Sequence, residues 1–221
     1  MGWRKVIGFR RWGAELRVKV SSGYRLVRFA LAPLLSLSLP PLGFAEWQAV
    51  EVVKTYKVYG ETGPELYASI GERGPQVAAG RRVIAHTNFK LTWTRQYENQ
   101  GRSCVLVSAV PKLTVTYMLP KAAARLSSPT EENWERFIAG VDAHERVHGR
   151  MIKDLVHRIE ATSVGLTVTD DPECMKIRVE LTRRLKALSD THQKANSDFD
   201  RAELSDGGNI HQLILALVNG G

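Results

Sequence analysis

Apolar and polar residues alternate through the first half of the chain and predict β-strands. Residues 50–59 are rich in Val and Tyr, and residues 82–97 place apolar and polar side chains on alternate faces. Residues 104–119 form a third β-rich stretch, in which Pro111 predicts a break. Short connections between these stretches favour an antiparallel sheet.

Helical signals follow two capping patterns. Thr62 and Glu65 form a T-x-x-E box, which predicts a short helix over residues 63–71. The run Ser128-Pro129-Thr130-Glu131 is a second box with Pro at the first helical position, and it predicts a long helix that ends near residue 163. Spacings of 3 and 4 place one stripe on a single face of this helix: Trp134, Phe137, Val141, His144, His148, Met151 and Leu155.

A second long helix is expected to begin near Glu173, after the loop around Asp170, and to end near Asp206. Its stripe includes Ile177, Leu181, Leu185, Leu188, His192, Ala195 and Phe199. The predicted fold class is therefore α+β: an antiparallel β-sheet followed by a long antiparallel helical hairpin. Within a single domain, 46–221, residues 46–120 are mainly β and residues 128–206 form the hairpin. The apolar tail, Ile210 to Val218, is too short to span a membrane and can pack back on the domain.

The first 45 residues have the character of a signal peptide. Residues 1–28 hold eight basic side chains and one acid, and residues 29–45 are apolar and contain three prolines. Gly43 and Ala45 fit the small positions before a cleavage site, so the mature chain is expected to start at Glu46. This predicts export to the periplasm or the medium, with membrane contact only in transit. The alternative is an uncleaved membrane anchor.

The net charge of +8 belongs to this leader. Residues 46–221 carry 23 basic and 22 acidic residues, a net of +1. A body with so little excess charge gives no support for a nucleic-acid partner.

The two cysteines, Cys104 and Cys174, both follow the leader. An even pair in an exported protein indicates a disulfide. Two buried free thiols are the alternative. Neither cysteine belongs to a C-x-x-C pair, which argues against a cysteine zinc site.

Residues 144–148 read His-Glu-Arg-Val-His, an H-E-x-x-H motif. On a helix, His144 and His148 lie one turn apart on one face and can bind one Zn²⁺. Glu145, rotated by about 100°, is placed to act as general base on a metal-activated water. Two core histidines paired with polar groups are the structural alternative.

Zinc needs a third protein ligand, and the predicted hairpin supplies candidates. If the two helices were symmetric about their connection, His148 would lie opposite residue 188 and His144 opposite His192. His192 is therefore the first candidate, although a core histidine is an equal reading. The further candidates are Asp198, Asp200, Glu203 and Asp206.

The order TYKVYGETGPEL, Gly74-Pro75, AHTNFKLTWT and HERVHGRM resembles a bacterial family of unknown function whose members are described as predicted secreted zinc-dependent proteases. The resemblance covers roughly residues 50–205 and implies that His144, Glu145 and His148 form the site of a zincin-like metalloprotease domain. The family ends with Tyr-Asp and then Thr-x-His-Gly. This chain has Phe199-Asp200 and then Asp206-Gly207, so the resemblance makes Asp206 the alternative third ligand.

The favoured function is a secreted or periplasmic zinc peptidase that acts on peptides or proteins. A non-catalytic envelope protein on the same scaffold and a cell-wall peptide amidase are the alternatives.

Overall fold

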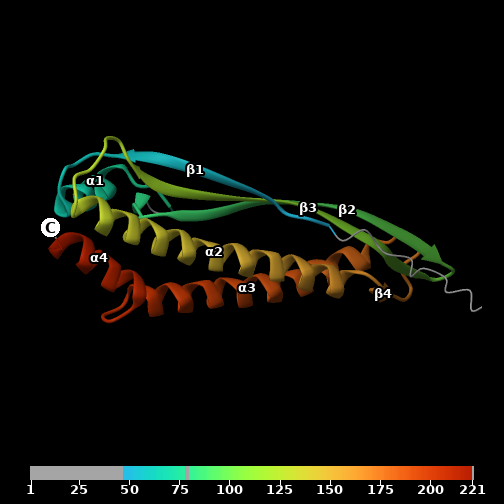
Figure 1. Ribbon diagram of the computed structural model, residues 1–221. Helices are drawn as coiled ribbons and strands as arrows, with labels where there is room; N and C mark the ends of the chain where they lie inside the picture. The colour runs from blue at the N-terminus through green and yellow to red at the C-terminus, as the bar shows by residue number, and fades with distance from the viewer. Residues whose placement is uncertain (1–46, 78–79, 221) are drawn as a thin grey trace, which may run out of the picture. The chain divides into compact units, whose positions relative to one another are not determined.

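A computed structural model describes residues 47–77 and 80–220, and Figure 1 shows a sheet followed by helices. The α+β class is confirmed. The proposed signal peptide lies outside the described residues. Within those residues, no helix combines the length and the apolar character needed to cross a membrane. The elements in chain order are β1 Val50–Val58, α1 Gly63–Arg73, β2 His86–Gln100, β3 Ser103–Ala122, α2 Thr130–Ser163, β4 Thr167–Val168, α3 Lys176–Leu204 and α4 Asn209–Asn219.

The sheet is mixed, so the prediction of an antiparallel sheet is wrong. β3 is central, with β2 antiparallel on one side and β1 parallel on the other, and β4 pairs with Cys104 and Val105 at the start of β3. Alternation of side chains reports which face a residue occupies but not the direction of its neighbour strand. The segment from α1 to β2 carries the chain across the sheet, which lets β1 and β3 run the same way.

The predicted break at Pro111 is also wrong, because β3 runs without interruption over 20 residues. β1 pairs only with Thr114–Ala122 and β4 only with Cys104 and Val105. Among the described residues, the strand therefore has a paired neighbour at Pro111 only on the β2 side, where Trp93 is its partner. A missing N–H on the open side removes no ladder hydrogen bond.

α2 packs along one face of β3. Leu113, Val115 and Tyr117 of β3 are buried against Ile152 and Val156 of α2. Toward the start of α2, the buried core contains Trp134, Phe137 and Val141 together with residues from β1, α1 and α4. The apolar tail, which forms α4, thus packs on the domain as expected. These contacts fix the height of the motif helix above the sheet.

α2 ends at Ser163 as predicted, but its predicted capping box is wrong. The helix begins at Thr130, and Pro129 is the N-cap residue without a side-chain cap. The Ser128 hydroxyl lies 3.2 Å from the Glu132 carboxylate instead of accepting a backbone N–H. The predicted box at Thr62 and Glu65, by contrast, is present at the start of α1.

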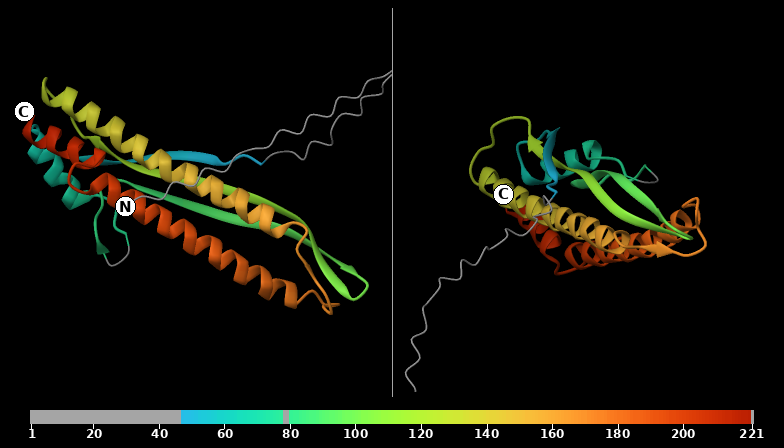
Figure 2. Two further views of the ribbon diagram at one scale, coloured as in Figure 1. Left: turned by 90° about the horizontal axis from the view of Figure 1, so that it is seen from below. Right: turned by 90° about the vertical axis from the view of Figure 1, so that its right-hand side faces the viewer.

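The connection from α2 to α3 is held by β3, by a disulfide and by one buried carboxylate. Cys104 of β3 is bonded to Cys174, as predicted. Asp171 accepts hydrogen bonds from the backbone N–H groups of Met175, Lys176 and Ile177 at 2.8 to 3.0 Å. α3 therefore begins at Lys176, three residues later than predicted, and returns beside α2 (Figure 2).

Candidate metal centre

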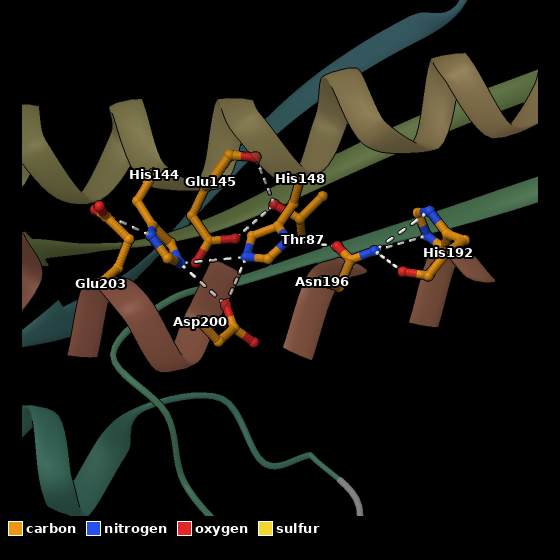
Figure 3. Close-up of polar contacts among 8 residues, drawn as sticks. All are labelled: Thr87, His144, Glu145, His148, His192, Asn196, Asp200 and Glu203. Carbon is orange, nitrogen blue, oxygen red and sulfur yellow. Dashed lines mark hydrogen bonds and ion pairs between the residues drawn. The ribbon is translucent and has the colours of Figure 1, made fainter. Parts of the chain in front are cut away.

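Three side chains from two helices meet where α3 passes α2 (Figure 3). His144 Nε2 and His148 Nε2 on α2 lie 3.2 Å apart. Asp200 Oδ1 on α3 lies 2.8 Å from His148 Nε2 and 3.3 Å from His144 Nε2. His144 lies on the side of α2 that faces α3, and Asp200 lies on the side of α3 that faces α2. The pairing of the two helices therefore brings the three side chains together.

The spacing of these donor atoms suits a small divalent ion. With bonds of about 2.0–2.1 Å, two ligand atoms of a tetrahedral zinc site lie about 3.3 Å apart. The three observed separations are 2.8, 3.2 and 3.3 Å. Two imidazoles and one carboxylate are also a common donor set for catalytic zinc. His144, His148 and Asp200 could therefore hold a metal ion. Three protein ligands leave the fourth position of a tetrahedral site for another ligand.

Glu145 is held beside this group by the first residues of β2. Its side chain is only 5% exposed, so its carboxylate needs a polar partner. Thr87 Oγ1 lies 2.5 Å from Glu145 Oε2 and 3.1 Å from the backbone oxygen of the same residue. The hydroxyl donates to the carboxylate and fixes its direction. Thr87 was not among the residues singled out from the sequence.

Asp200 and His148 shift each other's pKa. Burial opposes ionisation of Asp200, but hydrogen bonds from His144 and His148 hold the pKa of Asp200 well below its usual range. Burial also lowers the pKa of His148, yet hydrogen bonds to Asp200 and Asn196 outweigh it and raise that pKa above its ordinary value. The metal-free group therefore favours a carboxylate paired with an imidazolium, an arrangement that a cation can replace.

The two residues predicted as the third ligand, His192 and Asp206, do not lie with His144 and His148. His192 lies two helical turns before Asp200 on α3, and its ring contacts the Asn196 amide at 3.1 and 3.3 Å. Asp206 is fully exposed beyond the end of α3, and its nearest charged partner is His211 at 4.0 Å. Asp200, one of the further candidates, occupies the third position instead.

The offset between the helices has a measurable cause. Asp200 is 24 residues into α3, whereas His148 is only 15 residues from the end of α2. After α2 the chain follows β3 outward, with backbone hydrogen bonds first at Leu106 and then at Arg102. Four strand residues span about 13 Å, which equals about nine residues of helix. A symmetric hairpin, the basis for choosing His192, omits this excursion.

Two further residues of α3 contact the histidines. Phe199 stacks on His144 with ring centroids 4.7 Å apart and meets His148 edge-on at 5.4 Å. Asn196 Oδ1 lies 2.5 Å from His148 Nδ1. Asn196, Phe199, Asp200 and Glu203 recur at spacings of 3, 1 and 3, so they share the face of α3 that meets α2. Polar residues on a helical face that is otherwise apolar were the sequence signal that could have identified Asn196 and Asp200.

The group opens into a cleft of about 1030 Å³. One wall comes from residues 81–87 and Phe89, and the opposite wall from α3 between His192 and Ser205. His144, Glu145 and His148 line it together with Asp200. The site is thus accessible to a ligand far larger than water and is bordered by apolar and basic side chains.

The comparison with protein families identifies this chain, whereas no curated protein and no solved structure matches it. The matching model covers residues 53–208, which include all of α1, β2, β3, α2, β4 and α3 and most of β1. The chain belongs to the family described as "Bacterial protein of unknown function (DUF922)".

Proposed function

We propose that this protein is a zinc-dependent hydrolase, a peptidase, with His144, His148 and Asp200 as the metal ligands and Glu145 as the general base. One observation carries the proposal. Three donor atoms at tetrahedral spacing and a buried, oriented carboxylate line the same open cleft. Two histidines with a purely structural role would need neither the cleft nor the Glu145 carboxylate in addition to that of Asp200.

Each residue has a separate task in this proposal. A bound zinc ion would supply Lewis acidity, which would lower the pKa of water and polarise a carbonyl group. Glu145 accepts a proton during attack and returns it to the leaving amine. Thr87 holds the Glu145 carboxylate at one oxygen, which leaves the other oxygen free for the proton. The walls of the cleft position an extended chain against these groups.

The separation of binding from chemistry provides the test. Glu145→Gln should keep zinc and lose turnover by about 10²–10⁴-fold, because the ligands remain and the base is lost. Glu135→Gln, on the exposed side of the same helix, is the matched control and should change neither. The two measurements are zinc content, by elemental mass spectrometry, and cleavage of a fluorogenic peptide library.

Loss of a ligand should have the opposite signature. Asp200→Ala and His148→Ala should lose tightly bound zinc, whereas His192→Ala should retain it because His192 contacts Asn196 and not the group. A native protein that takes up no zinc and cleaves no peptide would refute the enzyme proposal. The non-catalytic binding protein would then be the better interpretation. Cleavage of cell-wall peptides alone would identify an amidase instead.

The compartment is part of the same proposal: the protein works outside the cytoplasm. The disulfide between Cys104 and Cys174 supports this, since such bonds persist in oxidising compartments. N-terminal sequencing of the protein recovered from the periplasm or the medium should find a chain that starts at Glu46. A chain recovered only from the cytoplasm, with both thiols reduced, would contradict it.

A further inference from the structure

Both ring nitrogens of His148 have polar partners, and the partners differ in kind. Nε2 faces Asp200 Oδ1 at 2.8 Å and His144 Nε2 at 3.2 Å, inside the candidate metal group. Nδ1 faces Asn196 Oδ1 at 2.5 Å, away from the group. The two nitrogens of one imidazole are therefore assigned to two different tasks.

The orientation of the Asn196 amide follows from a third contact. Asn196 Nδ2 lies 2.7 Å from the backbone oxygen of His192, and a carbonyl oxygen can only accept a hydrogen bond. The NH₂ group must therefore point at His192, which leaves Oδ1 for His148. Because Oδ1 also only accepts, His148 Nδ1 must carry a hydrogen. Because Asn196 keeps the hydrogen on Nδ1, Nε2 is the ring nitrogen that can give up its hydrogen to bind a metal ion; it faces Asp200 Oδ1 at 2.8 Å (Figure 3).

We propose that Asn196 is a positioning residue for the metal centre: it fixes the ring of His148 and its tautomer so that Nε2 is the ligand atom. The proposal rests on the proposed function, since it requires a metal at this group. A hydrogen-bond acceptor behind a metal-bound histidine commonly contributes about 10–100-fold to metal affinity. Asn196 is not one of the three candidate ligands and would act only through His148.

The other histidine shows what such a residue adds. His144 Nδ1 is buried and has no hydrogen-bond partner among the described residues. The nearest carboxylate, Glu203 Oε2, is 3.7 Å away, beyond hydrogen-bond reach. His144 is held by stacking on Phe199 instead. The two ligands are therefore unequal, and the tautomer of His148 is the one already set by a hydrogen bond.

Metal affinity and a spectroscopic signature test the proposal. Zinc affinity is measured by competition with a chromophoric chelator, and the visible bands of the Co²⁺-substituted protein report ligand geometry. Asn196→Ala should weaken zinc binding by about 10–100-fold and alter the Co²⁺ bands. Asn196→Asp, which keeps an acceptor at the same place, should restore both. Gln193→Ala, on the exposed side of the same helix, is the matched control and should bind zinc as the native chain does.

The outcomes separate this proposal from the proposed function. Native protein that binds zinc, with Asn196→Ala folded and equally tight, overturns the role of Asn196 and leaves the metal site intact. Native protein that binds no zinc overturns the proposed function, and this inference falls with it. Equal losses in the Ala and Asp variants would show that the asparagine matters for packing or for its hydrogen bond to His192 rather than as an acceptor for His148, which also overturns the proposal.

Discussion

A side chain at Gly149, the residue after the H-E-x-x-H motif, should destabilise the protein. A Cβ at this position would lie 2.0 Å from Tyr117 Oη and 2.8 Å from Tyr117 Cζ. Tyr117 is only 1% exposed in the centre of β3, and the Arg146 guanidinium covers its ring at 4.2 Å. Neither the ring nor the helix can move without disturbing the other. Gly149→Ala should therefore push α2 away from the sheet.

Two opposed effects determine the size of the change. Overpacking a well-filled core costs about 1–3 kcal/mol. Alanine favours a helix over glycine by about 1 kcal/mol, which offsets part of that cost. An approach of 2.0 Å to the buried Tyr117 places the overpacking cost in the upper part of its range, about 2–3 kcal/mol. The net destabilisation should then be about 1–2 kcal/mol, which lowers Tm by roughly 2–8 °C in a domain of this size. His148 precedes Gly149 directly, so zinc affinity should fall as well.

The assay is thermal unfolding of the metal-free protein, followed by zinc competition. Gly71→Ala is the matched control, because a Cβ there meets no atom of the described residues within 4 Å and α1 should gain stability. Tyr117→Phe removes the closest atom and should recover part of the loss when combined with Gly149→Ala. A Gly149→Ala protein as stable as the native one, with unchanged zinc affinity, would refute the close approach of α2 to β3.

Three other perturbations have defined outcomes. Replacing Cys104 and Cys174 together by Ala should lower the free energy of unfolding by about 4 kcal/mol, because the bond closes a loop of 70 positions; chemical denaturation measures it, and an unchanged midpoint would contradict it. Asp171→Asn should lower Tm at neutral pH. Burial opposes ionisation of Asp171, but three backbone N–H groups lower its pKa, so the native protein has this contribution above the unfolded pKa and loses it as the pH falls through the folded one. A Tm gap between native and variant that persists at acid pH would count against this account. For His148, whose pKa is raised, the sign is reversed: the metal-free protein should lose stability as the pH rises through that pKa, and zinc affinity should fall as the pH drops below it, because the proton competes with the ion. Calorimetry at several pH values tests both trends, and a zinc affinity independent of pH would exclude His148 as a ligand.

Local patterns in the sequence predicted most elements of the fold. The T-x-x-E box at Thr62 and Glu65 predicts α1, because a cap depends only on residues within one turn. Period 3.6 in α2 placed His144 and His148 on one inward face, and the pairing of two cysteines was predictable from their number. Such features need no knowledge of the neighbouring element.

The failures share one origin, which is geometry between elements far apart in sequence. The direction of β1 relative to β3, the passage of β3 through Pro111 and the register of α3 against α2 are all set by packing. None of them changes the periodicity of any single segment. A period shows which residues face a neighbour but not which residues of the neighbour they meet.

The motif His144-Glu145-x-x-His148 is therefore what the sequence determined by itself, since two residues four apart on a helix must share a face. The third donor was decided only by tertiary structure. The chain follows β3 for about 13 Å before α3 turns back, so Asp200 rather than His192 reaches the histidines. The same register brings Asn196 behind His148, and the start of β2 brings Thr87 to Glu145. A candidate metal site assembled from a local pair and distant partners is predictable only as far as the local pair, because its other members depend on how far the chain travels before it returns.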